Sequence, residues 1–228
     1  MLRHSVLWTL RDTTTPELRL EMLKGLAFLG TECRSVSHGD FGEDLFGGSS
    51  ASDQARAIPM WRREGLGPPA SFDAALHLDF EDWARFEEYG ADPVHESASR
   101  FNESVSWDEL TARVDWYFEG EPPTSRGRVK HVAMFVWADD IDEGQKEGAL
   151  GAASALVEAP EVEVVLTGVN SGIHPSDYDW IMNVQVPDPV AAERLLGGPA
   201  YAQAMEAVAA VTKYEWTASV THLMRGRI

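Results

Sequence analysis

The sequence has 228 residues, of which 44% are apolar and 25% charged, a composition typical of globular proteins with a substantial core. Its net charge of −18 argues against nucleic acids and anionic membranes as partners, because both are bound through Lys and Arg. The single cysteine, Cys33, excludes an intramolecular disulfide and favours a reducing compartment. No apolar run reaches the length of a membrane span and the N-terminus lacks a signal-peptide cleavage site, so we expect a cytoplasmic protein.

Three sequence blocks recur in the same order in the two halves of the chain. The first pairs RHSVLWTLRD at residues 3–12 with KHVAMFVWAD at residues 130–139. The second pairs FDAALHLDFED at 72–82 with YDWIMNVQVPD at 178–188, and the third pairs DPVH at 92–95 with GPAY at 198–201. This pattern predicts two copies of one structural unit, fused head to tail.

Each copy is predicted to follow the order β-α-β-β-α-β. Thr15 and Pro16 are typical of the start of a helix and Gly30 of its end. Alternating residues in the 72–80 block predict a strand with one apolar face and one polar face, and His77 on the polar face meets either solvent or a partner.

The expected elements of the first copy are 3–10, 16–29, a strand ending near 39, 72–80, 82–109 with a break near Gly90 and Pro93, and 111–118. Those assigned in the second copy are 130–137, 142–158, a strand ending near 168, the 178–188 block and 215–223. A four-stranded sheet with helices on one face leaves its other face bare, and the other copy is the simplest cover. We therefore expect an α+β fold in which the two copies pack sheet to sheet.

The domain boundaries follow from composition. Repeat one is expected over residues 1–118 with an insert at 43–70, and repeat two over 129–228. The segment 119–128 is polar and rich in Pro and Gly, which is typical of a linker. The chain is thus expected to form an intramolecular pseudo-dimer, and a further homodimer stays open.

The motifs resemble those of the stress-responsive A/B barrel family, or Dabb family. The resemblance rests on the histidine in the first strand of each copy, the Gly after the second strand and the DPVH segment at 92–95, and it covers both repeats apart from the insert and the linker. Single-domain members of this family, which belongs to the dimeric α+β barrel (ferredoxin-like) group, pair two chains into one barrel. The resemblance implies two tandem ferredoxin-like repeats that form an intramolecular α+β barrel.

A catalytic branch of that family, olivetolic acid cyclase, performs an aldol condensation of a polyketide without a cofactor. It uses a Tyr and a His six residues apart, together with a further His on the first strand. Tyr89, His95 and His4 match these positions. The resemblance implies that His95 is a base, Tyr89 a hydrogen-bond donor and His4 an orienting residue. Asp92 departs from the pattern, because the cyclase has a histidine there, and so does Leu26, which replaces a pocket tyrosine.

The second repeat keeps only part of this set. It has His131 at the place of His4, but Leu195 and Tyr201 at the positions of the Tyr–His pair, so a cyclase-like site is expected once per chain. Because the strand histidine is repeated, it also fits a structural role as a buried residue that is hydrogen-bonded to a neighbour. The Tyr–His pair likewise fits a role in packing a broken helix.

Metal and cofactor sites are not expected. The seven histidines show neither His-x-His nor His-x3-His spacing. Neither a dinucleotide-binding motif nor a P-loop is present, and Cys33 lies in no motif of a catalytic nucleophile.

The insert is the largest difference between the repeats, since repeat one has 23 more residues than repeat two between its second and third strands. Long loops in compact domains often cover binding sites. The insert carries Trp61 next to Arg62, and we expect these two to hold an aromatic or anionic substrate together with Trp8 and Phe72. The alternatives are a surface insertion without a role and, for Trp8, a place in the core.

Three functions remain open at this point. The first is a cofactor-independent acid–base enzyme of the cyclase, lyase or isomerase type that acts on a small apolar or aromatic carbonyl compound, such as a polyketide. The second is a non-catalytic barrel that is stress-responsive or binds a small ligand. The third is a cofactor-free or haem-linked monooxygenase of the same superfamily. In each case the expected partner is a small molecule.

Overall fold

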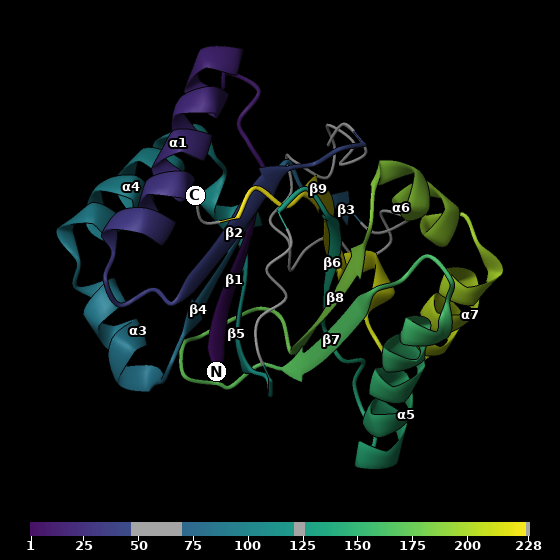
Figure 1. The fold of residues 1–228 in the computed structure, drawn as a ribbon. Helices are drawn as coiled ribbons and strands as arrows, with labels where there is room; N and C mark the ends of the chain where they lie inside the picture. Colours follow the sequence, from purple (N-terminus) through teal and green to yellow (C-terminus); the bar gives the residue numbers. More distant parts are fainter. Residues whose placement is uncertain (47–69, 121–125, 227–228) are drawn as a thin grey trace.

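The computed structural model describes residues 1–46, 70–120 and 126–226, and Figure 1 gives its fold. In the first half, strands in the order β2-β4-β1-β5 form one antiparallel sheet, and three helices cover its outer face. The elements are β1 (Leu2–Trp8), α1 (Pro16–Glu32), β2 (His38–Glu43), β4 (Ala74–Phe80), α3 (Trp83–Gly90), α4 (Pro93–Val105) and β5 (Ala112–Tyr117).

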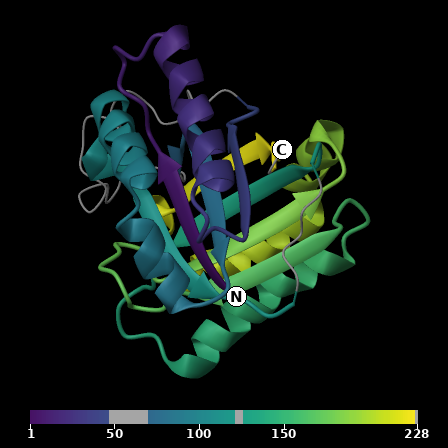
Figure 2. The same ribbon diagram turned by 60° about the vertical axis from the view of Figure 1, so that its left-hand side comes forward.

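The second half repeats this arrangement. Its sheet has the order β3-β9-β6-β8-β7, and α5, α6 and α7 lie on the outer side (Figures 1 and 2). The elements are β6 (Val129–Phe135), α5 (Glu143–Ser154), β7 (Val164–Val169), β8 (Trp180–Val186), α6 (Pro189–Leu196), α7 (Pro199–Ala209) and β9 (Ala218–Leu223). The two sheets face each other, so the predicted fold of two ferredoxin-like repeats packed sheet to sheet is confirmed. No helix of the described residues is long and apolar enough to cross a membrane.

One short strand links the halves in a way that was not expected. β3 (Ala70–Ser71) follows the insert of repeat one, yet it pairs in parallel with β9 of repeat two. The backbone N–H of Asp44 donates to the carbonyl of Asp73 at 2.9 Å. The two ends of the insert therefore meet on the sheet of the other repeat.

The first helix and second strand differ from the prediction for a packing reason. α1 continues through Gly30 to Glu32, and β2 begins at His38 instead of ending there. A Cβ atom built on Gly39 would lie 3.2 Å from the Cα of Gly30. Because neither residue has a side chain, the helix crosses the strand at close range. Gly30 serves this crossing, although a glycine at such a position is also typical of a helix end.

The interior between the sheets is apolar at one end and charged at the other. At the charged end, Arg3 donates two hydrogen bonds to Asp79 at 2.6 and 2.8 Å. The sequence left undecided whether His77 meets solvent or a partner. It is buried at this end and stacks on His222 of repeat two with ring centroids 5.5 Å apart. The apolar end includes Leu7, Ala75, Val114, Val132, Met134, Ile181 and Val220.

One ion pair at the charged end joins the two sheets directly. Nζ of Lys130 on β6 lies 2.7 Å from Oδ2 of Asp40 on β2, and both groups are buried. The two groups carry opposite charges, whose attraction is strong away from water. Burial acts to raise the pKa of Asp40, but Lys130, His222 and Arg3 together outweigh it and leave that pKa below its ordinary value.

Breaking this pair should cost far more stability than breaking a surface pair. We expect Lys130→Met to lower the free energy of unfolding by about 3–5 kcal/mol, because it leaves the Asp40 carboxylate buried and unpaired. The double variant Lys130→Met with Asp40→Leu should recover most of that loss. Arg85→Met, which breaks the exposed pair with Glu88, should cost less than about 1 kcal/mol. Urea denaturation measures all three, and an equal loss for both single variants would contradict the buried role.

The fold should also weaken in mild acid. Burial lowers the pKa of His77, His131 and His222, that of His131 to about 4. Between pH 6.5 and about 4.5 the unfolded chain therefore binds protons that the folded chain does not. We expect the free energy of unfolding to fall over this window, by up to about 1.4 kcal/mol per pH unit for each such histidine. Replacing His131 with Asn should flatten that slope, and an unchanged slope would contradict its burial in the neutral form.

Candidate active site

The break between α3 and α4 brings Tyr89 and His95 together. The Asp92 side chain accepts a hydrogen bond from the N–H of Val94 at 2.8 Å, and Pro93 occupies the first helical position, so α4 starts there. Tyr89 at the end of α3 and His95 in the first turn of α4 have ring centroids 4.1 Å apart. The departure at Asp92 thus has a local reason, since this residue caps the helix.

His4 reaches the same place from the sheet. It faces Asp115 across the β1–β5 pairing, and both side chains lie on the helix-covered face. Nδ1 of His4 lies 2.6 Å from Oδ1 of Asp115, and the imidazole packs beside Phe86 and Tyr89 at centroid distances of 5.2 and 6.3 Å. The carboxylate accepts the Nδ1 proton, so Nε2 of His4 is left for a ligand.

Repeat two contributes to this site through the connection between β7 and β8. Nδ1 of His174 lies 2.9 Å from Oδ2 of Asp115, so one carboxylate holds two imidazoles. The connection is fixed to β5 by the N–H of Ser171, which donates to the carbonyl of Asp115 at 2.6 Å, and by the Ser176 hydroxyl on the carbonyl of Arg113. The site therefore combines side chains of both repeats, whereas the sequence placed it in repeat one alone.

Sequence reasoning missed both Asp115 and His174. Asp115 stands on the predicted last strand, which adjoins the first in a β-α-β-β-α-β unit, so an acidic residue across from His4 was a usable signal. His174 had no comparable signal, because it lies in a loop of the other repeat and only the packing of the two sheets brings it close.

The pKa values of the site are set by burial and by these contacts. Burial acts to raise the pKa of Asp115, but the interactions with His4 and His174 together outweigh it and leave that pKa below its ordinary value. Burial lowers the pKa of His95 and raises that of Tyr89 well above its usual range. At neutral pH the arrangement therefore holds a neutral imidazole beside a protonated phenol.

A cavity of about 60 Å³ opens at this cluster. His4, Tyr89 and His95 line it together with Trp8, so the structure brings these four predicted residues together. The mouth is polar and carries the exposed side chains of Asp108 and Arg113 among others. This volume is well below the roughly 300–1,000 Å³ of common small-molecule sites and accommodates only a few non-hydrogen atoms.

The three other predicted substrate contacts have different outcomes. Phe72 is buried in the core between the sheets and does not line the cavity. Trp61 and Arg62 lie outside the described residues. Any contribution of the insert to the site stays a prediction.

The equivalent place in repeat two is closed by a hydrogen bond. Nε2 of His131 lies 2.8 Å from the hydroxyl of Tyr201, and Nδ1 lies 2.8 Å from Oγ1 of Thr221. Both ring nitrogens are thus satisfied inside the protein. Tyr201 lies at the position that His95 has in repeat one. Its hydroxyl bonds Nε2 of His131, whereas the equivalent Nε2 of His4 is left at the cavity.

Other kinds of site find little support. Within residues 1–46, 70–120 and 126–226, no three His, Cys, Asp or Glu side chains are grouped to hold a metal ion. Burial raises the pKa of the Cys33 thiol to about 12, which leaves it protonated and a poor nucleophile.

Comparison with known proteins supports the fold and leaves the function open. No protein-family model and no curated protein matches the sequence. Among solved structures, an anthrone oxidase-like protein aligns at 16% identity over 99% of this chain and 92% of its own, with a TM-score of 0.63. A protein provisionally described as a monooxygenase, from Fusobacterium nucleatum subsp. nucleatum, aligns at 7% identity over 98% and 91%, with a TM-score of 0.58. Another, from Lactobacillus acidophilus, aligns at 11% over 98% and 93%, with a TM-score of 0.54. At these identities the likeness concerns the fold of the whole chain.

Replacing Asp115 should disturb both histidines that it holds. The two Nδ1 atoms face different oxygens of Asp115, and the amide of an Asp115→Asn variant keeps an acceptor at only one of these two places. We expect the tautomer of His4 or of His174 to change, which correlation spectra of the histidine ring nitrogens detect. Asp108→Asn at the exposed mouth is the control and should leave both rings unchanged. If both rings keep their Nδ1 protons in Asp115→Asn, the carboxylate does not hold them.

Proposed function

We propose that this cavity is the active site of a cofactor-independent acid–base enzyme, which removes a proton from the carbon next to a carbonyl group. The observation that carries the proposal is the contact of Tyr89 with His95, 4.1 Å between ring centroids, at a cavity that His4 also lines. A base and a hydrogen-bond donor on one small cavity are the two groups that enolate formation needs.

His95 is the proposed base. Its Nδ1 lies 3.4 Å from the carbonyl of Gly90, which favours the tautomer whose Nε2 carries the lone pair. Burial lowers its pKa, so the imidazole is neutral and able to accept a proton at pH 7. The product of that step, an imidazolium, returns the proton to the substrate or to water.

Tyr89 and His4 are the proposed partners of the developing enolate oxygen. The raised pKa of Tyr89 keeps its hydroxyl protonated, and within the described residues that hydroxyl has no hydrogen-bond partner, so it can donate to the oxyanion. His4 is oriented by Asp115, which accepts its Nδ1 proton. Asp115 and His174 act through His4 and are positioning residues.

The cavity volume limits the substrate. About 60 Å³ is room for a carbonyl group and the atoms next to it, and it is small for an aromatic ring or a polyketide chain. The Dabb-like motifs support the assignment of the Tyr–His pair, but the size favours a small carbonyl compound, or one small end of a longer one, over the polyketide of the cyclase branch.

A cofactor-free oxygenase is the second candidate. It is supported by the descriptions of the full-length structural neighbours as monooxygenases and as an anthrone oxidase-like protein. The same base serves both functions, since the carbanion that it forms can return to the ketone or react with dioxygen. Uptake of oxygen in the assay below separates the two. A non-catalytic barrel is the outcome if no exchange and no uptake occur.

Proton abstraction can be tested before the natural substrate is known. Small ketones and aldehydes incubated with the protein in D2O should exchange the protons next to the carbonyl, which NMR follows. We expect His95→Gln to lower the exchange rate by about 10²–10⁴-fold and Tyr89→Phe by about 10²–10³-fold. Because the pKa of His95 is lowered by burial, exchange should persist below pH 6.5 and fall only as this imidazole becomes protonated.

Tyr201→Phe is the matched control, because it removes the hydroxyl at the equivalent position of repeat two. It should leave the exchange rate unchanged. Equal rates in the parent protein and in His95→Gln would contradict the proposed base.

A further inference from the structure

A second and larger cavity lies where the two repeats meet, and we call it the junction cavity. Its volume is about 430 Å³, within the range of small-molecule sites. Repeat one supplies apolar walls from α1 and β2, and repeat two closes the cavity with the end of β9. These walls are Leu20, Leu23, Ala27, Phe41, Leu223 and Met224. None of them lines the cavity at His95, so the two cavities are separate.

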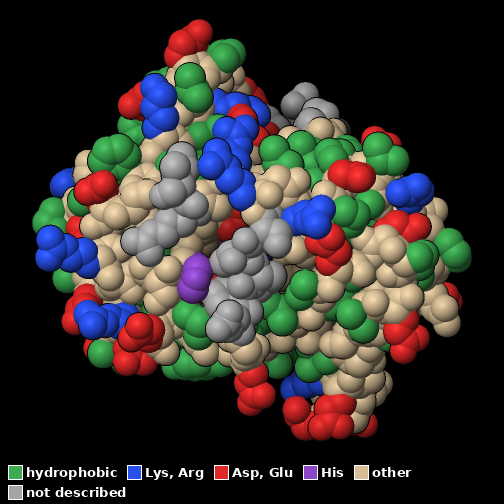
Figure 3. All heavy atoms as spheres, in the orientation of Figure 1, with side chains coloured by type: hydrophobic (Ala, Val, Ile, Leu, Met, Phe, Trp, Pro, Cys, Tyr) green, Lys and Arg blue, Asp and Glu red, His purple; other side chains and the backbone are tan. Residues whose placement is uncertain are grey.

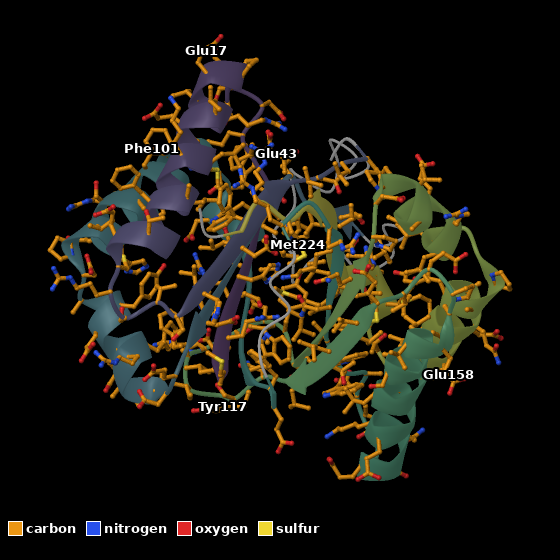
Figure 4. All side chains as sticks on the ribbon, in the orientation of Figure 1. Glu17, Glu43, Phe101, Tyr117, Glu158 and Met224 are labelled. Atoms are coloured by element: carbon orange, nitrogen blue, oxygen red, sulfur yellow. The ribbon has the colours of Figure 1, made fainter. Side chains whose placement is uncertain are left out.

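The rim of the junction cavity is cationic in a strongly acidic protein. Lys24, Arg126 and Arg225 line it, and no acidic residue stands among its described lining residues. Lys and Arg side chains gather beside α1 on this face (Figure 3), where Figure 4 labels Glu43 and Met224. Three of the 19 basic residues therefore lie around the junction cavity, although the chain has 37 acidic residues.

Carboxylates nearby neutralise these cations only in part. Glu21 lies 3.2 Å from Nζ of Lys24, and Glu43 lies 3.8 Å from Nη2 of Arg225 while it also faces Arg19 at 3.6 Å. Arg126 forms no ion pair with any residue that the structure describes. Arg19 also faces Asp73 at 3.8 Å, so Glu21, Glu43 and Asp73 offset Arg19, Lys24 and Arg225. The rim keeps the positive charge of Arg126 as an excess.

A cavity of equal size in repeat two serves as an internal comparison. It measures about 450 Å³ and lies between the end of α5 and α7, with walls made mainly of alanine. Its charged lining residue is Glu158, so its potential is opposite in sign. Volume and apolar surface are therefore common to both cavities, and only the junction cavity adds cations.

We propose that the junction cavity binds a small amphipathic organic anion with an apolar body and one carboxylate. The walls take the apolar part, and the two arginines match a carboxylate, which accepts paired hydrogen bonds from guanidinium groups. A body of about ten to twenty non-hydrogen atoms suits a cavity of this size. The site is independent of the chemistry at His95.

The test compares decanoate with 1-decanol, which share a ten-carbon chain and differ in charge. Calorimetric titration of the full chain should show decanoate binding about tenfold or more tightly than decanol. Its affinity should fall as NaCl is raised from about 50 to 500 mM, since the rim is exposed to solvent. Equal affinities for both compounds, or no binding of decanoate, would overturn the proposal.

Two sets of variants locate the site. Arg126→Gln with Arg225→Gln should lower decanoate affinity about tenfold and leave decanol unchanged, and both side chains are exposed, so the fold is preserved. Ala27→Phe should fill the junction cavity and abolish binding of both compounds. Ala207→Phe, the same substitution at the alanine cavity of repeat two, is the matched control. If Ala207→Phe abolishes decanoate binding, or if the double variant binds it as the parent does, the assignment is wrong.

Discussion

The four central strands β1, β4, β6 and β8 are buried on both faces, and among the described residues the inner face of each lies against the sheet of the other half (Figure 2). Neither half can therefore hide its own sheet. Inside that contact, Lys130 of one half meets Asp40 of the other without access to water. A buried pair of this kind adds little stability over apolar side chains, but any other alignment of the sheets would strand two charges. The pair thus favours one arrangement of the halves, and the site at His95 depends on that arrangement.

The two repeats use one histidine position in opposite ways. His131 is bonded at both ring nitrogens by Thr221 and Tyr201, and it closes its side of the molecule. His4 gives one nitrogen to Asp115 and keeps the other at a cavity. The repetition favoured a structural role for both histidines. That role describes His131 in repeat two, but it does not account for the second ring nitrogen of His4 in repeat one. The difference comes from the residue at the start of the second long helix in each repeat. Tyr201 hydrogen-bonds His131 in repeat two, whereas His95 in repeat one leaves a cavity beside His4.

Much of the fold was readable in the sequence, because it rests on local patterns. Repeated blocks, alternating strands and the helix break near Gly90 and Pro93 identify the elements and their order. The bare face of each sheet identifies the other repeat as its cover. The sequence was misleading at Gly30, where a close helix–strand crossing has the same residue type as a helix end. The sequence did not predict β3 or the contact of Asp115 with His174, because both depend on how one repeat lies against the other. Cavity volume is likewise a property of packing, so the sequence does not give the size of the space at His95.

The insert of repeat one enters and leaves the fold through neighbouring backbone positions, Asp44 and Asp73, joined by a hydrogen bond of 2.9 Å. A loop whose ends are already held together adds little closure entropy as it grows, since doubling its length costs only about 0.6 kcal/mol. The barrel can accordingly accept segments of many lengths at this point without a change in register. Evolution can exchange material here while the two sheets stay as they are, and the same property makes this position a natural attachment point for grafting a recognition segment beside the barrel.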